Sequence, residues 1–273
     1  MLLFNPITKK QIKLLLNDLP QGLLLCGATG AGLLSTARYI AGTHIAAVIE
    51  PSDKDGNVNH EKGTITVKRI RELYDQTRSK SLQKQIFIID NADKMSTGAQ
   101  NAFLKLLEEP NDQVAFILTT HSQSLLLPTI VSRVEKLNIL PITREQSEQL
   151  LLGYKLPISK VGQALFVAVG RPAELARLAS DTDYFDAKAS IMGAAKTFIT
   201  GNRTDRLQTA FNYSSDREKA LQLLAASIAI VRFTIKNNPT TMTIEQADRL
   251  ARAYDAIAAN GNTKLHLVAT MVY

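Results

Sequence analysis

The stretch Gly27-Ala28-Thr29-Gly30-Ala31-Gly32-Leu33-Leu34 follows the apolar run 23–26 and decides the fold of the first part of the chain. Its spacing matches the phosphate-binding loop G-x-x-x-x-G-K-[ST] at every position except the last two. Glycine lets backbone N–H groups turn towards phosphate oxygens at the start of a helix. We therefore assign Gly27, Gly30 and Gly32 to a degenerate nucleotide site.

The groups that would hydrolyse a nucleotide are missing from this site. Leu33 stands where a lysine would contact the β- and γ-phosphates, and Leu34 where a hydroxyl would bind Mg²⁺. The apolar run 86–89 ends in Asp90, which could hold Mg²⁺ through water, but Asn91 follows in place of a glutamate that orients the attacking water. The sequence therefore predicts no ATPase activity and, at most, weak nucleotide binding.

The apolar runs of the first half are continuous rather than alternating, which predicts a parallel sheet covered by helices on both faces. These runs are 22–26, 45–49, 65–67, 85–90 and 115–119. Helices are expected over 35–41, from Lys68 onwards and over 97–109. The chain therefore starts with an α/β domain.

Past Pro141 no further strand-like run occurs, and the pattern becomes helical. Breaks at Pro157 and at 170–172 divide the next forty residues into three short helices. The remaining alanine- and leucine-rich segment is typical of a helical bundle. We expect an α/β domain over 1–142, a small three-helix domain over 143–182 and an all-α domain over 183–273.

Composition excludes several classes of protein. The chain has 273 residues, of which 45% are hydrophobic, and a single cysteine, so disorder, a disulfide framework and a multi-cysteine zinc site are not expected. Because no apolar run could span a bilayer and no signal peptide is recognised, we expect a cytoplasmic protein. The histidines show no metal-ligand spacing, so neither a metal nor a cofactor is assigned.

A net charge of +7 permits contact with nucleic acid without requiring it. The most basic segment is 61–84, which could face DNA or a neighbouring subunit, and the charges do not separate these alternatives. The segment also lacks the interleaved aromatic residues that stack on bases.

Two motifs carry a resemblance to a known family. The first is Asn101–Pro110 (NAFLKLLEEP), and the second is Leu127–Arg133 (LPTIVSR). Together with the segment 63–73 and the Asp90 region, they resemble the clamp-loader branch of the AAA+ proteins, within it the delta-prime family of bacterial DNA polymerase III. This resemblance implies a RecA-like AAA+ P-loop domain with a parallel sheet, a three-helix lid and an all-α C-terminal collar domain.

The resemblance also implies a function. It implies a non-hydrolysing clamp-loader subunit of the DNA replication machinery that helps load the sliding clamp onto primed DNA. Its partners would be ATP-binding gamma/tau-like and delta-like subunits in a hetero-pentamer, the sliding clamp and primer-template DNA, with no membrane partner. Two alternatives stay open: an active P-loop ATPase or kinase, and a stand-alone nucleic-acid-binding module.

The resemblance further implies that Arg133 is an arginine finger that acts in trans on a neighbouring ATPase subunit. The alternative is that Arg133 only braces the sheet edge through a local carboxylate. Thr119 or Thr120 occupies the position of a γ-phosphate sensor, although a plain strand-end threonine fits the degenerate site better. Arg171 lies beside a glycine, where a sensor role is doubtful.

Overall fold

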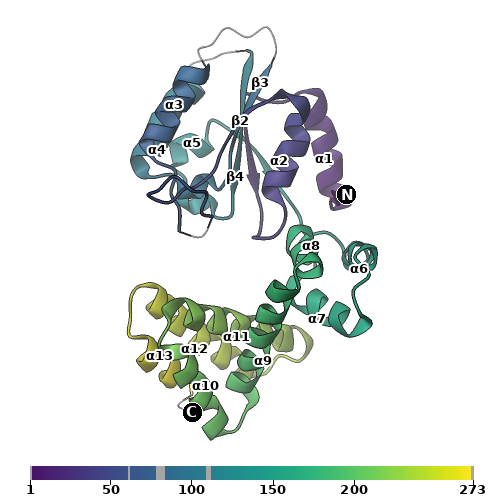
Figure 1. Cartoon of the computed structure of the whole chain (residues 1–273), viewed down its shortest axis with the longest axis vertical. Helices are drawn as coiled ribbons and strands as arrows, with labels where there is room; N and C mark the ends of the chain where they lie inside the picture. Colours follow the sequence, from purple (N-terminus) through teal and green to yellow (C-terminus); the bar gives the residue numbers. More distant parts are fainter. Residues whose placement is uncertain (1, 61, 78–83, 109–111, 272–273) are drawn as a thin grey trace. The chain divides into compact units, whose positions relative to one another are not determined.

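The computed structural model describes residues 2–60, 62–77, 84–108 and 112–271. The chain divides into two compact units, Met1–Ser180 and Asp181–Tyr273 (Figure 1). The predicted separation of the small helical domain, 143–182, from the α/β domain stays a prediction. No helix among the described residues combines the length and the apolar character that crossing a bilayer requires.

A parallel sheet forms the centre of the first unit. Its strands among the described residues are β1 (Gly22–Cys26), β2 (Ile45–Ile49), β3 (Gln85–Ile89), β4 (Val114–Thr120) and β5 (Glu135–Asn138), in the order β2-β3-β4-β1-β5. Every strand pair is parallel. The residues of the central strand β4 are all buried, as both of its faces are covered.

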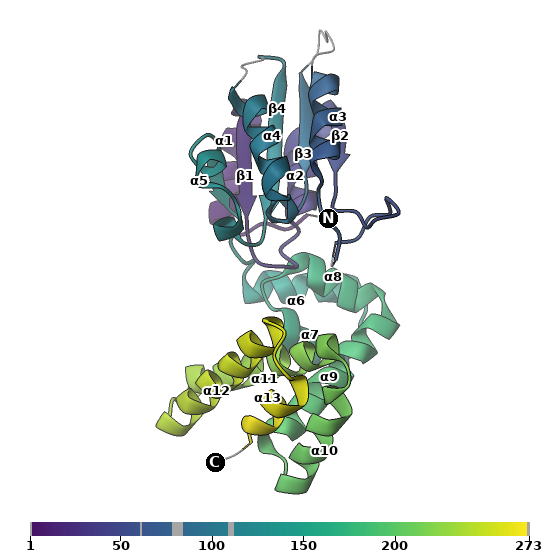
Figure 2. The ribbon, with the colours of Figure 1, turned by 90° about the vertical axis from the view of Figure 1, so that its left-hand side faces the viewer.

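Helices cover both faces of the sheet, as predicted (Figures 1 and 2). One face carries α1 (Pro6–Asn17) and α2 (Leu33–Ala41), and the other carries α3 (Val67–Thr77), α4 (Thr97–Glu108) and the short α5 (Pro128–Val131). Single turns of 3-10 helix are η1 (Gly42–His44), η2 (Ala92–Lys94) and η3 (Gln123–Leu125). On one face of the sheet Phe116 packs against Phe103 of α4. On the other face Ile117 packs in the core with residues of α2.

The first unit continues into three helices, α6 (Arg144–Gly153), α7 (Ile158–Ala168) and α8 (Pro172–Ser180). Thr143 and Gln146 form a capping box that starts α6. Gly170 has a φ of 82°, a conformation that glycine adopts without strain, and the next helix begins at once with Pro172. The predicted breaks at Pro157 and 170–172 are therefore both present.

The second unit is all helical. Its helices are α9 (Thr182–Thr200), α10 (Arg203–Ser214), α11 (Arg217–Asn237), α12 (Thr241–Ala258) and α13 (Thr263–Ala269). Each begins after a residue whose side-chain oxygen accepts a hydrogen bond from a first-turn N–H, and these residues are Asp181, Asn202, Asp216, Thr240 and Asn262. The polar caps explain why the helices begin where they do.

Three local features differ from the expectations. Ile65 forms only an isolated bridge to Met95, and α3 begins at Val67, so the expected strand 65–67 is wrong. Neither α1 nor β5 was expected. In β5 the polar residues are exposed and only Leu137 is buried, so its sequence lacks the apolar run of a buried strand. Two predictions fall partly outside the described residues. The expected end of the helix over 97–109 lies at 109–110, and the basic segment 61–84 includes 61 and 78–83.

Two buried serines provide a test of the helical packing. Ser227 in α11 is fully buried, and its hydroxyl has no hydrogen-bond partner among the residues that the structure describes. Ser227→Ala should therefore leave the free energy of unfolding unchanged or raise it by about 1 kcal/mol. Ser147 in α6 is equally buried, but its hydroxyl donates to the Thr143 carbonyl (2.9 Å) and accepts from the Gly170 N–H (3.1 Å).

Ser147→Ala is the matched control and should lower the free energy of unfolding by about 1–3 kcal/mol, because it leaves a buried N–H unpaired. Urea unfolding, followed by amide hydrogen exchange in each unit, measures both changes. A larger loss of stability in Ser227→Ala than in Ser147→Ala would contradict this account.

Candidate functional site

The glycine-rich loop connects β1 to α2 at the carboxyl edge of the sheet. Gly30 and Gly32 have φ angles of 85° and 82°, in the left-handed region that favours glycine. Gly32 caps α2 through its backbone and accepts hydrogen bonds from the Thr36 N–H and hydroxyl, both at 2.9 Å. Gly27, Gly30 and Gly32 thus all lie in the connection between β1 and α2, while Leu33 is buried against the sheet.

Helix α8 packs directly on this loop. The backbone N–H groups of Ala173 and Glu174 donate to the Gly30 carbonyl at 2.9 and 3.2 Å. A Cβ atom placed on Gly30 would lie only 2.7 Å from the Glu174 Cβ. The N-terminus of a helix can bind an anion. The N-terminus of α8 instead binds the Gly30 carbonyl of its own chain.

Asp90 follows β3 and lies at the same carboxyl edge, with a side chain that is 7% exposed. Its Oδ1 accepts a hydrogen bond from the Thr119 hydroxyl (2.6 Å), and its Oδ2 accepts one from the Asn91 side chain (3.1 Å). The His60 Nδ1 atom lies 3.6 Å from the same Oδ2. Two donors of the chain itself, Thr119 and Asn91, therefore bind the carboxylate that could have held Mg²⁺, and His60 lies next to it.

Polar residues at the end of β4 and before α8 also bond within the chain. Thr120 donates through its hydroxyl to Asp93 (2.8 Å). The His121 Nδ1 atom lies 2.9 Å from the Gly27 carbonyl, which links β4 to the start of the glycine-rich loop. Arg171 donates to the Val167 carbonyl of α7. Thr120, His121 and Arg171 are thus each engaged in a contact within their own chain.

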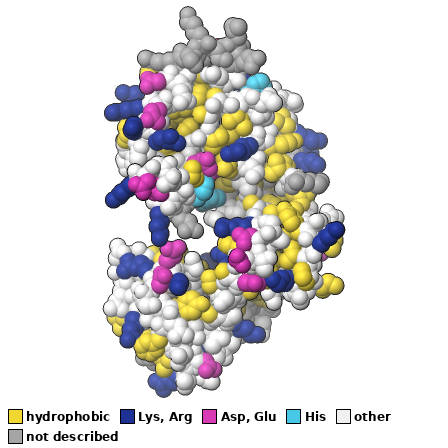
Figure 3. Space-filling view, viewed as in Figure 1, with side chains coloured by type: hydrophobic (Ala, Val, Ile, Leu, Met, Phe, Trp, Pro, Cys, Tyr) yellow, Lys and Arg dark blue, Asp and Glu magenta, His cyan; other side chains and the backbone are white. Residues whose placement is uncertain are grey.

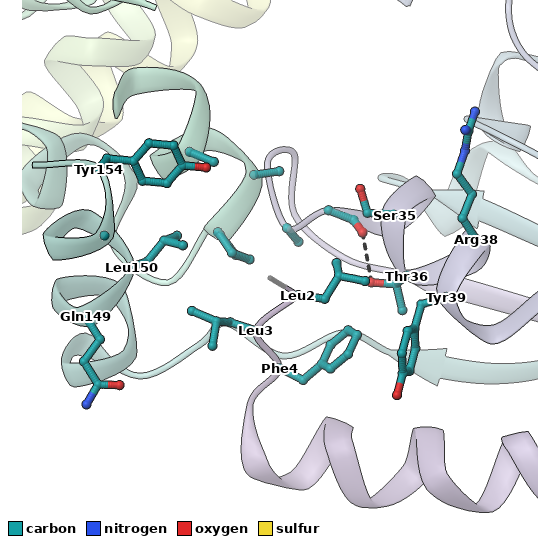
Figure 4. Close-up of a pocket in the computed structure, with 16 residues that line it drawn as sticks. Leu2, Leu3, Phe4, Ser35, Thr36, Arg38, Tyr39, Gln149, Leu150 and Tyr154 are labelled. Atoms are coloured by element: carbon teal, nitrogen blue, oxygen red, sulfur yellow. Dashed lines mark hydrogen bonds between the residues drawn. The ribbon is translucent and has the colours of Figure 1, made fainter. Parts of the chain in front are cut away.

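A pocket of about 830 Å³ opens beside the loop (Figure 4). Residues from the N-terminal segment, α2, α6 and α8 line it, and they include Leu3, Phe4, Tyr39, Leu150 and Tyr154. Arg38 is the one charged residue among those that line it, all of which the structure describes. Figure 4 shows the Arg38 side chain directed away from Leu3 and Phe4. The pocket is therefore mainly apolar and offers little charge to a polyphosphate.

Arg133 lies at the opposite edge of the sheet from the loop. It precedes β5, whose Glu135 pairs in register with Leu23 near the start of β1, whereas the loop follows the end of β1. The Arg133 Nη2 atom is 2.9 Å from Glu108 Oε1, and Nη1 donates to the Thr129 carbonyl at 3.1 Å. The side chain is still 40% exposed. This exposed ion pair thus connects the motif 127–133 with the motif 101–110.

The direction of β1 separates Arg133 from the glycine-rich loop of its own chain. The five residues of β1 span roughly 13 Å at a rise of about 3.3 Å per residue. The Arg133 carbonyl lies beside Gly22, at the beginning of this strand. Arg133 is accessible, but at the edge of the sheet away from the loop.

Sequence reasoning missed Glu50 and His60. The structure brings both residues to Asp90, and one ligand atom from each of the three lies within 4.8 Å of the others. His60 comes from the β2–α3 connection, so no short spacing in the sequence indicated this cluster. The one available signal was that Glu50 and Asp90 each follow a strand of the same parallel sheet.

Comparisons with known proteins agree with this fold. The family model described as "DNA polymerase III, delta subunit" matches residues 43–143. Over 126 residues, which are 46% of this chain and 38% of the relative, the chain is 28% identical to DNA polymerase III subunit delta' of Bacillus subtilis. Over 97 residues, 34% of this chain and 27% of the relative, it is 36% identical to subunit delta' of Pseudomonas aeruginosa.

The chain resembles the delta-prime subunit of bacterial DNA polymerase III. These matches support a protein of the clamp-loader family, as the resemblance in the sequence predicted. The matched part spans only about two fifths of the length of the Bacillus relative. A DNA polymerase III gamma subunit-related protein of Thermotoga maritima has the same fold, with a TM-score of 0.55, 16% identity and 96% of both chains covered. The predicted α/β fold with a parallel sheet is thus confirmed.

The thiol of Cys26, at the end of β1, allows the burial of this position to be tested. Burial raises the pKa of the Cys26 thiol, and nearby Lys136 lowers it by a smaller amount. Because the thiolate is the reactive form, alkylation of the folded chain at mildly alkaline pH should be several-fold slower than alkylation in urea.

Cys26 is the only cysteine, so the number of alkyl groups added, measured by mass spectrometry, reports on this residue alone. Equal rates in the folded and unfolded chain would show that the thiol is not protected.

Proposed function

We propose that the chain is a non-hydrolysing clamp-loader subunit that helps load a sliding clamp onto primed DNA and supplies Arg133 in trans to a neighbouring ATPase subunit. The observation that carries the proposal is the position of Arg133, exposed at the sheet edge opposite the glycine-rich loop. An arginine placed there can reach a nucleotide only if another chain brings it. A guanidinium suits transferring phosphate because it is planar and always charged.

The state of the nucleotide site supports the non-hydrolysing part of the proposal. Leu33 and Leu34 replace the lysine and the hydroxyl, and Asp90 is bonded to Thr119 and Asn91 of its own chain. The adjoining pocket is mainly apolar. Gly27, Gly30 and Gly32 keep the shape of a phosphate loop without the charge that would neutralise a polyphosphate.

The partners follow from the same proposal. They are ATP-binding gamma/tau-like and delta-like subunits in a hetero-pentamer, the sliding clamp and primer-template DNA. In this scheme 1–142 is the AAA+ domain, 143–182 the lid and 183–273 the collar that joins the subunits, and the protein acts in the cytoplasm. Relatives named as delta' and as gamma/tau subunits support partners of this class.

The two alternatives have less support. An active ATPase would have to work with Leu33 and Leu34 at the phosphate site. A stand-alone nucleic-acid-binding module would need a basic surface of its own, but Figure 3 shows Lys and Arg side chains spread among acidic and hydrophobic ones on the visible face rather than forming one continuous basic stripe.

The isolated chain tests the first alternative. We expect no ATP turnover above background and a dissociation constant for ATP weaker than micromolar, since no loop lysine contacts the phosphates. A phosphate-release assay and equilibrium dialysis with labelled ATP measure these two quantities. Turnover by the isolated chain, or micromolar affinity, would favour the enzyme over the non-hydrolysing subunit.

The reconstituted complex tests the role of Arg133. With ATP-competent partner subunits, clamp and primed DNA, we expect Arg133→Ala to remove the turnover of the site that it serves, because an arginine finger contributes about 10³–10⁵-fold. Gel filtration first establishes that the variant assembles.

Arg144→Ala is the matched control, because Arg144 is also exposed and also lies 2.9 Å from a glutamate, Glu148. We expect it to leave turnover unchanged. Equal turnover in Arg133→Ala and Arg144→Ala, with assembly intact, would reduce Arg133 to a brace of the sheet edge. Failure of the wild-type chain to assemble would rule out the clamp-loader function itself.

A further inference from the structure

Three segments of the first unit bring an imidazole and two carboxylates together. Glu50 directly follows β2 and Asp90 directly follows β3, and the Asp90 N–H donates to the Ile49 carbonyl at 2.8 Å. The connection after β2 turns back on itself, with the Asn59 N–H bonded to the Pro51 carbonyl at 2.8 Å. This turn carries His60 to the end of both strands.

We propose that Glu50, His60 and Asp90 form a binding site for a divalent transition-metal ion of the zinc type. The His60 Nδ1 atom lies 3.6 Å from Asp90 Oδ2, and Nε2 lies 3.4 Å from Glu50 Oε1. Two ligands that share a tetrahedral zinc ion at bond lengths of about 2.0–2.1 Å lie roughly 3.3 Å apart. Nδ1 and Oδ2 therefore have nearly the separation of two such ligands, and one ligand atom from each of the three residues, Glu50 included, lies within 4.8 Å of the others.

The neighbours of Asp90 orient it as a metal ligand. The Thr119 hydroxyl donates to Oδ1 at 2.6 Å, which fixes the carboxylate and leaves Oδ2 directed towards His60. Such a second contact holds a ligand in place and is common around bound metals. Asn91 Nδ2 lies 3.1 Å from Oδ2 and 3.2 Å from Nδ1, so a rotation of this amide would present its oxygen as a further ligand.

The donor set and its accessibility select the class of ion. One imidazole with two carboxylates suits Zn²⁺, Co²⁺ or Mn²⁺ better than Ca²⁺ or Mg²⁺, which prefer oxygen ligands alone. The His60 side chain is 48% exposed, so an ion can reach the site from solvent, whereas Asp90 is nearly buried. None of these ligands comes from the glycine-rich loop, so the site requires no nucleotide, and its metal binding can be measured in the absence of clamp-loader partners.

Binding of the ion would fasten the β2–α3 connection to the edge of the sheet. Glu50 begins this connection and His60 lies further along it, whereas Asp90 follows β3, so the ion would link the connection to the end of that strand. Metal binding should therefore protect the backbone around residues 51–60 from proteolysis. It would also engage the Asp90 carboxylate, which a Mg²⁺–nucleotide complex would otherwise need.

The test uses the full chain without a histidine tag, freed of metal with a chelator. Zn²⁺ is titrated by calorimetry, Co²⁺ by visible absorption, and protection of the loop is followed by limited proteolysis. We expect one ion per chain and slower cleavage in the connection when Zn²⁺ is present. His60→Ala should weaken metal binding by at least about 10-fold. Removal of a group that only supports a ligand already costs about that much, and His60 is itself a ligand.

Glu50→Gln should also weaken binding, since it removes a ligand charge at nearly constant size. His44→Ala, which removes an exposed histidine of the same unit, is the matched control and should bind like the wild type. Circular dichroism of the metal-free variants verifies that they fold. A wild-type chain that binds neither ion, or His60→Ala that binds as tightly as the wild type, would overturn the proposal.

Discussion

A carboxylate at the tip of a buried strand must find its partners inside the protein, and this requirement organises the carboxyl edge of the sheet. Asp90 is almost inaccessible to water, and a buried charge without hydrogen bonds would cost several kcal/mol. The chain lacks the loop hydroxyl that would have shared a Mg²⁺ ion with it. Instead, the Thr119 hydroxyl and the Asn91 side chain bond to the carboxylate, and His60 lies next to it.

The parallel direction of the strands gives the two edges of the sheet different roles. Every carboxyl end lies at the edge that carries the glycine-rich loop, Asp90 and His60, because all strand pairs are parallel. Arg133 precedes β5 and therefore lies at the amino edge. The Arg133–Glu108 pair is exposed and contributes little to stability, about 0–1 kcal/mol. Under the proposed function, the Arg133–Glu108 pair holds the guanidinium group in position.

Strong apolar runs made most of the fold predictable. The strands at 22–26, 45–49 and 85–89 and the helical part after Pro141 follow from continuous apolar segments and from proline, glycine and asparagine breaks. The edge strand β5 was missed because only Leu137 is buried, so its pattern resembles a loop. Ile65 was assigned to a strand because a buried isoleucine in a loop has the same local signal as a strand residue.

By itself, the sequence determined the class of the fold and the losses in the phosphate loop, because these depend on residue types at fixed short spacings. The pairing of Arg133 with Glu108 and the gathering of Glu50, His60 and Asp90 were decided by the tertiary structure alone. The physical reason is that these contacts join segments far apart in the chain. Their geometry depends on which strands lie side by side and on where each connection turns back.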